Sequence, residues 1–234
     1  MSRPSVVFAS GQLLTEAVWA PQRAALAPAC DLTHADHTQD DTIAGMALRL
    51  LGAAPPRFHL VAHAMGGFTA FEVMRRAPER VLSLVLIATL APNDGPAQTE
   101  RRQGYIRLVE AGRFDEVVEE RIPILVHPDR RGDADLLAVV RRMASDTGAE
   151  TFLRQQRAIM SRLDSRPSLA AIKVPTLLIR GDADGITTEA HQAEMLAGIA
   201  DARLEVISDC GHLPTLERPD QTNRLLTRWL EEGT

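Results

Sequence analysis

The run Val81–Ala88, VLSLVLIA, constrains the fold most, because it is apolar at every position except Ser83. A strand with one face in water alternates apolar and polar residues, whereas a strand covered on both faces does not. The run therefore predicts a central strand in a sheet that has a layer of structure on each side. Such sheets are parallel, and their strands are joined by helical crossovers.

Strand and helix patterns alternate along the rest of the chain. Short apolar or β-branched runs predict strands, and amphipathic stretches with caps or proline and glycine stops predict helices. The sequence therefore predicts the α/β class, with a mostly parallel sheet flanked by helices. Strands are expected at 5–9, 58–61, 174–179 and 203–207, and helices at 21–27, from a cap at Asp40 or Asp41 to before Gly52, at 68–76, at 190–199 and at 219–230.

The middle of the chain follows a different pattern. From about Asn93 to Arg166 no strong strand pattern occurs, and apolar residues recur at helical spacing. This predicts a helical lid over residues 93–170, inserted into a core formed by 1–92 and 171–234. Its arginines could bind an acidic substrate, but most of them are expected to form surface ion pairs, each of little energetic value. They include Arg154, Arg157, Arg162 and Arg166.

The segment Val61–Gly67 connects an expected strand to an expected helix. Ala62 and Gly66 are small residues two positions before and two after Ala64. A sharp strand-to-helix turn needs such residues because the helix passes close to the strand. The helix would also point its positive end at the turn. The alternative is an ordinary glycine-rich turn with no chemical role.

The chain resembles the α/β-hydrolases along its whole length. His63-Ala64-Met65-Gly66-Gly67 is similar to the His-Ser-Met-Gly-Gly nucleophile elbow of that family, with Ala64 in place of the serine. It departs from the family at Ala62, where the strict pattern has glycine, and at Ser10-Gly11-Gln12, where relatives carry His-Gly-x. Three further segments resemble family motifs in the family's order: Pro78-Glu79-Arg80-Val81, Gly181-Asp182-Ala183-Asp184 and Cys210-Gly211-His212.

The resemblance implies roles for particular residues. Ala64, Asp184 and His212 would occupy the positions of the nucleophile, acid and base, with Asp182 as the alternative acid. The backbone N–H groups of Gln12 and Met65 would form the oxyanion hole. Residues expected to contact the substrate are Leu13, Leu90 and Leu213.

The implied activity is hydrolysis of a carboxylic ester without a cofactor, although lactones, thioesters and carbon–carbon bonds remain open as substrates. Alanine carries no nucleophile, so a chain with Ala64 forms no acyl-enzyme at this position. One interpretation is an engineered serine-to-alanine change that traps substrate. The other is a natural loss, which would leave a non-catalytic ligand-binding protein or a serine-independent lyase.

Composition restricts the remaining possibilities. A net charge of −5 does not indicate a basic surface that would bind nucleic acid or an anionic membrane. Two cysteines make no disulfide framework, and the apolar run Val6–Ala9 is too short for a signal peptide or a membrane span. We therefore expect a cytoplasmic protein that acts on a small-molecule ester, with its oligomeric state open. His34-Ala35-Asp36-His37 is expected to be a solvated loop and not a metal site.

Overall fold

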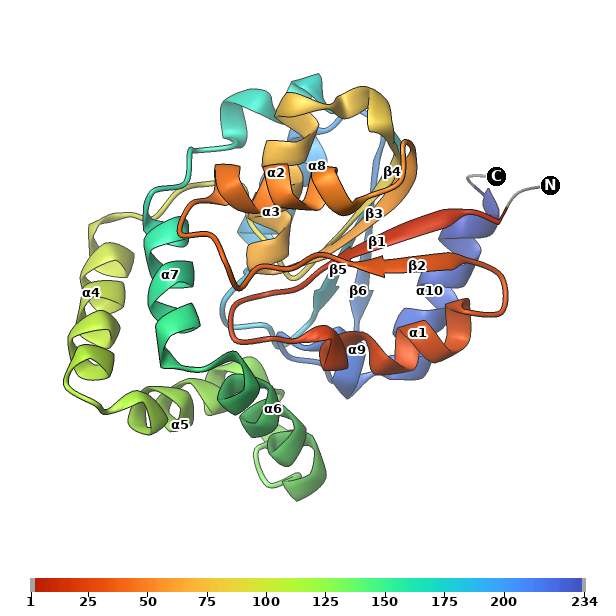
Figure 1. Cartoon of the computed structure of the whole chain (residues 1–234). Coiled ribbons are helices and arrows are strands. Elements are labelled where there is room, and N and C mark those ends of the chain that lie inside the picture. The colour runs from red at the N-terminus through yellow and green to blue at the C-terminus, as the bar shows by residue number, and fades with distance from the viewer. Residues whose placement is uncertain (1–2, 233–234) are drawn as a thin grey trace.

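The computed structural model describes residues 3–232, which form a six-stranded parallel sheet between two layers of helices (Figure 1). The strand order is β2-β1-β3-β4-β5-β6, so β3 and β4 are central, as the apolar run of β4 predicts. The strands are β1 (Ser5–Ala9), β2 (Asp31–His34), β3 (Phe58–His63), β4 (Val81–Ile87), β5 (Thr176–Gly181) and β6 (Ala202–Ile207).

Alternate residues of each strand enter two separate cores, because successive side chains point to opposite faces of a sheet. Val7 and Leu60 belong to one core, together with side chains from α2 (Ile43–Ala53), α3 (Met65–Arg76) and α8 (Glu189–Gly198). Val6 and Val61 belong to the other core, with side chains from α1 (Ala20–Leu26) and α10 (Pro219–Glu232). These helices cover the two faces of the sheet in Figure 1.

Two local features differ from the sequence-based expectations. Strand β2, which no apolar run marks, pairs along its length with β1 at the edge of the sheet. Helix α2 begins after Thr42 and not after Asp40 or Asp41, because the Thr42 side chain accepts a hydrogen bond of 3.0 Å from the Gly45 N–H. Asp40 forms an ion pair with Arg49 instead.

Four helices lie between β4 and β5 in the sequence and project beside the sheet (Figure 1). They are α4 (Pro96–Glu110), α5 (Phe114–Leu125), α6 (Ala134–Thr147) and α7 (Ala149–Met160), and we call residues 93–170 the helical insertion. No helix within residues 3–232 is long and apolar enough to span a membrane. The remaining short helices are η1 (Glu16–Trp19), η2 (Pro78–Arg80), η3 (Pro128–Arg130), η4 (Arg166–Ala171) and α9 (Pro214–Glu217).

A buried ion pair joins the beginning of the helical insertion to the segment that follows α7. Arg162, expected on the surface, is almost fully buried and lies 2.9 Å from Asp94. Arg102 of α4 binds the same carboxylate. Burial alone would raise the pKa of Asp94, but the two guanidinium groups outweigh it and hold the pKa below its usual range.

Candidate active site

Ala64 lies at the turn between β3 and α3 in a conformation that L-residues rarely adopt, with φ 50° and ψ −113°. Hydrogen bonds hold this turn on both sides. The Ala64 N–H donates to the Ile87 carbonyl at 2.9 Å, and the Ala64 carbonyl accepts from the Thr89 hydroxyl at 2.8 Å. A strained backbone that its surroundings over-determine is typical of functional sites.

The two glycines after this turn are required by close packing. A Cβ atom on Gly66 would lie 2.1 Å from the Ala9 carbonyl oxygen, and one on Gly67 would lie 2.2 Å from the Thr89 Oγ1. Both distances are far below van der Waals contact. Helix α3 therefore passes against the end of β1 and against the segment after β4, which aims its N-terminus at residue 64.

His212 and Asp184 form a buried hydrogen-bonded pair next to this turn. The distance between His212 Nδ1 and Asp184 Oδ2 is 2.9 Å. Asp184 also accepts hydrogen bonds from the Ile186 N–H, at 2.8 Å, and from the Thr187 N–H, at 3.0 Å. Burial alone would raise the pKa of Asp184, but His212 and the Thr187 hydrogen bonds hold it well below its usual range. Asp184 is therefore a carboxylate that fixes the ring orientation of His212.

The loop that carries His212 is held by a second buried carboxylate. Glu217 accepts hydrogen bonds from the N–H groups of Gly211, Leu213 and His127, at 2.9, 3.2 and 2.6 Å. The ring of His63 adds a donor, since its Nε2 lies 2.8 Å from the His212 carbonyl oxygen. These contacts fix the backbone of the loop while the ring of His212 lines the cavity described below.

Asp182, the alternative acid, has a different environment. Its carboxylate accepts hydrogen bonds from the N–H groups of Asp209 and Cys210, at 3.1 and 3.0 Å. It thereby ties the turn after β5 to the turn after β6. The structure shows no hydrogen bond between Asp182 and His212 among the described residues, so Asp184 is the carboxylate that contacts the imidazole.

The two expected oxyanion donors flank residue 64. Met65 is the first residue of α3, and Gln12 lies in the loop after β1. This loop packs tightly over the turn, because a Cβ atom on Gly11 would lie 3.1 Å from the Ala64 Cβ. No hydrogen bond joins either expected donor N–H to another described residue. Both N–H groups are therefore free to bind a ligand.

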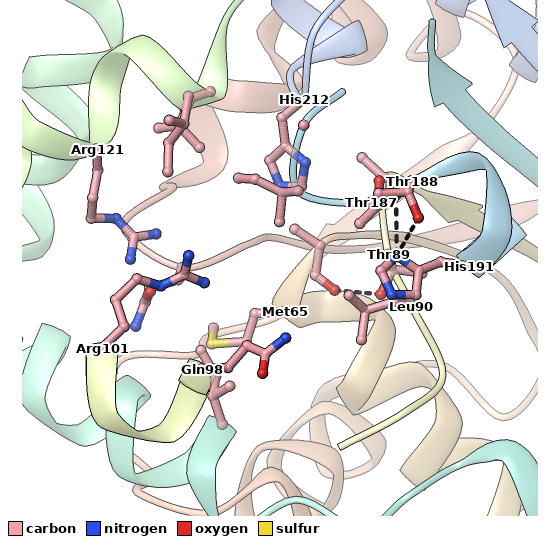
Figure 2. Close-up of a pocket in the computed structure, with 18 of the residues that line it drawn as sticks. Met65, Thr89, Leu90, Gln98, Arg101, Arg121, Thr187, Thr188, His191 and His212 are labelled. Atoms are coloured by element: carbon pink, nitrogen blue, oxygen red, sulfur yellow. Dashed lines mark hydrogen bonds between the residues drawn. The ribbon is translucent and has the colours of Figure 1, made fainter. Parts of the chain in front are cut away.

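A cavity of about 590 Å³ opens at this site (Figure 2). Ala64, His212, Gln12, Met65 and Leu90 all line it. Its volume lies within the usual range for small-molecule sites.

The other two expected substrate contacts lie elsewhere in the structure. Leu13 lines a smaller neighbouring cavity and has a positive φ of 60°. Leu213 is fully buried and belongs to the core between the sheet and α10. Neither residue is among those that line the large cavity. Sequence spacing places both next to the motifs, but it does not give the direction of their side chains.

Sequence reasoning missed most of the charged residues of the cavity, and Arg162 is the one cavity arginine among those named from the sequence. Several arginines line it, whereas Asp94 is the one acidic residue among the described residues that do so. In the sequence these arginines are ordinary charges on amphipathic helices, so no local signal sets them apart. They are Arg101, Arg102, Arg121, Arg131 and Arg162.

His34 and His37 lie beside the loop after β1. His34 Nε2 is 2.7 Å from the Ser10 Oγ, and His37 Nδ1 is 3.1 Å from the Ser10 carbonyl oxygen. The Trp19 indole N–H donates to the same hydroxyl at 2.9 Å. Ser10, which departs from the family pattern, is thus fixed by ring side chains. Within residues 3–232, no group of three or more histidine, cysteine or acidic side chains is arranged to hold a metal ion.

The chain matches the model of a known protein family over most of its length. Residues 6–225 match the model of the alpha/beta hydrolase family, and the chain belongs to that family. It is 31% identical over 183 residues to 2-hydroxy-6-oxo-6-phenylhexa-2,4-dienoate hydrolase of Comamonas testosteroni, a match that covers 75% of this chain and 63% of that protein. It is 28% identical over 236 residues to 3-oxoadipate enol-lactonase 1 of Acinetobacter baylyi, covering 93% of this chain and 85% of that protein.

Solved structures share the fold over nearly the whole chain. A malate-bound thermophilic esterase from Thermogutta terrifontis superposes with a TM-score of 0.90 at 25% identity, covering 99% of this chain and 91% of the esterase. An enol-lactonase from Burkholderia xenovorans gives a TM-score of 0.88 at 23% identity, covering 99% and 92%. The chain spans less than two thirds of the first two curated relatives, 63% and 64% of their length.

Proposed function

We propose that this site is that of a carboxylic ester hydrolase with a Ser-Asp-His arrangement, in which Ala64 replaces the nucleophile. The hydrogen bond of 2.9 Å between His212 and Asp184, on a cavity that also exposes Ala64, carries the proposal. The pair has the geometry of a base and its orienting acid. In this proposal Ala64 is an engineered replacement of serine, which stops turnover and leaves the rest of the site intact.

With a serine at position 64, His212 would take the hydroxyl proton as the oxygen attacks the ester carbonyl. Asp184 would hold the imidazole in the correct tautomer and stabilise the imidazolium. The N–H groups of Gln12 and Met65 would bind the developing oxyanion. With alanine the covalent path is absent, so the chain would bind an intact ester in the cavity.

The names of the relatives support this class of reaction. They include an enol-lactonase, an esterase and a 2-hydroxy-6-oxo-6-phenylhexa-2,4-dienoate hydrolase. We propose an ester or a lactone as the substrate. Acyl transfer from either one uses a base, an oxyanion hole and a cavity next to residue 64. In the proposal the helical insertion acts as a lid over the substrate.

The test is the Ala64→Ser variant on a panel of aryl and alkyl esters, with Ala64→Gly as the matched variant that lacks a hydroxyl. We expect turnover and a covalent adduct at residue 64 with a fluorophosphonate in the serine variant alone. A folded Ala64→Ser protein with neither turnover nor adduct would overturn the proposal. Turnover by the unchanged Ala64 chain at a similar rate would favour serine-independent chemistry at His212.

The role of Asp184 is tested in the Ala64→Ser background. We expect Asp184→Asn to lower kcat roughly 10³- to 10⁴-fold, because the asparagine amide would favour the wrong tautomer of His212. Asp182→Asn should have a much smaller effect on kcat, since Asp182 bonds only turn N–H groups among the described residues. Equal losses of kcat in the two variants would show that the acid is wrongly assigned.

A further inference from the structure

We propose that Arg101 and Arg121 bind a carboxylate of the substrate, so that the ester held at residue 64 also carries an anionic arm. The inference rests on the proposed function for the ester, but the anion site is argued independently of any reaction. Figure 2 shows both guanidinium groups turned into the same cavity that His212 and Met65 line. Arg101 comes from α4 and Arg121 from α5.

Arg121 is a partly buried cation that forms no ion pair with a described residue. Its Nε is buried and has no hydrogen-bond partner among the described residues, and no ion pair to its guanidinium is present. The group lies over two aromatic rings instead, 5.7 Å from the centre of Tyr105 and 5.8 Å from that of Phe152. Burial lowers the pKa of Arg121 to about 10, so the side chain remains protonated at neutral pH. A partly buried charge without an ion-pair partner is unfavourable, and an anion would lower that cost.

Among the described residues, the nearby carboxylates form no ion pair with Arg101 or Arg121. Asp94 binds both Arg102 and Arg162. Glu120 accepts a hydrogen bond from the Tyr105 hydroxyl at 3.0 Å. Arg101 has no hydrogen bond or ion pair with a described residue, so the two guanidinium groups face the cavity without a carboxylate bound to either of them.

A carboxylate fits this arrangement. Guanidinium groups present planar forks of N–H donors that match the two oxygens of a carboxylate, and such bonds are among the strongest in proteins. Gln12 also lines this cavity, and its side-chain Nε2 is a buried donor with no partner among the described residues. The cavity of about 590 Å³ can hold an ester group at residue 64 and a short acidic arm.

The test is binding to the Ala64 chain itself, measured by calorimetry with the monomethyl and dimethyl esters of four- to six-carbon diacids. We expect at least one half-ester to bind about tenfold or more tightly than its diester, with the difference falling as salt is added. Arg101→Gln and Arg121→Gln should each weaken half-ester binding about tenfold or more while leaving diester binding within about twofold. Arg107→Gln, on α4 and paired with Glu100 outside the cavity, is the matched control.

Equal affinities for half-ester and diester, or half-ester binding unchanged in Arg101→Gln, would overturn the inference. Arg101 is exposed, so that variant remains informative even if Arg121→Gln does not fold. The Ala64→Ser enzyme separates this inference from the proposed function. Arginine-dependent binding without any hydrolysis would leave the anion site standing and remove the esterase. Hydrolysis of half-esters and diesters at rates that do not change when either arginine is replaced would support the esterase and overturn the anion site.

Discussion

At the scale of single residues, the backbone of Ala64 is strained. Its backbone is left-handed although it is not glycine, and the Ile87 carbonyl and the Thr89 hydroxyl hold it there. An L-residue in this region costs about 1–3 kcal/mol relative to an ordinary conformation. The side chain at this position is thereby held on the wall of the cavity, near His212.

We therefore expect Ala64→Gly to raise the free energy of unfolding by about 1 kcal/mol. Glycine removes the strain of the positive φ, and this gain exceeds the roughly 0.4–1 kcal/mol by which glycine stabilises the unfolded chain. Chemical denaturation measures the change. Ala62→Gly is the control, because Ala62 lies in the buried interior of β3 with no positive φ, and it should lower the stability. A loss of stability in both variants would show that residue 64 is unstrained.

At the scale of elements, helix α7 of the insertion is joined to the core through Gln155. Its Oε1 accepts a hydrogen bond from the Leu13 N–H at 3.1 Å, and its Nε2 donates to the His37 carbonyl at 3.2 Å. Leu13 has a positive φ of 60° and follows Gln12 directly. A side chain of the insertion thus holds the loop that would carry an oxyanion donor.

In the Ala64→Ser background we expect Gln155→Ala to lower kcat about tenfold with little change in KM. The loop after β1 would lose its support, and the Gln12 N–H would no longer be aimed at the oxyanion, whose donors act mainly in the transition state. Steady-state kinetics on one activated ester gives both constants. Gln103→Ala, on an exposed position of α4, should leave both unchanged. An effect on KM alone would assign Gln155 to substrate binding.

In the molecule as a whole, the cavity lies between the core and the helical insertion, which contribute different kinds of lining residue. The core supplies Ala64, Met65 and His212, whereas the insertion supplies Arg101 and Arg121. The groups proposed for the chemistry therefore lie just after the carboxyl ends of strands. Those proposed for substrate choice lie on helices of the insertion. In many enzymes a rigid core holds the catalytic residues, and the connecting segments around it set the substrate specificity.

Exchange of residues 93–170 for the corresponding segment of a relative, again with Ala64→Ser, is expected to change the ester preference and keep hydrolysis. The frame of His212 and Asp184 lies outside the exchanged segment, whereas most of the cavity's cations lie within it. Ratios of kcat/KM across the ester panel measure the preference. Unchanged ratios in an active chimera would place the specificity in the core.

Elements with local signals could be predicted from the sequence alone. Strand β4 was set by its apolar run, and the turn at Ala64 by the small residues that the close approach of α3 to β1 requires. The order of the motifs placed Asp184 and His212 after successive strands, and parallel strands bring such ends to one edge. These features depend on periodicity and on steric exclusion over a few residues.

Contacts between distant segments set which side chains face the cavity, and the sequence pattern does not contain them. The edge strand β2 depends on pairing with β1, and Leu213 belongs to the core although it follows His212 directly. Arg101 and Arg102 are adjacent on α4, yet Arg102 is tied to Asp94 and Arg101 is free to face a ligand. An amphipathic pattern gives the buried face of a helix, but the neighbour against which that face packs is set by contacts between distant segments.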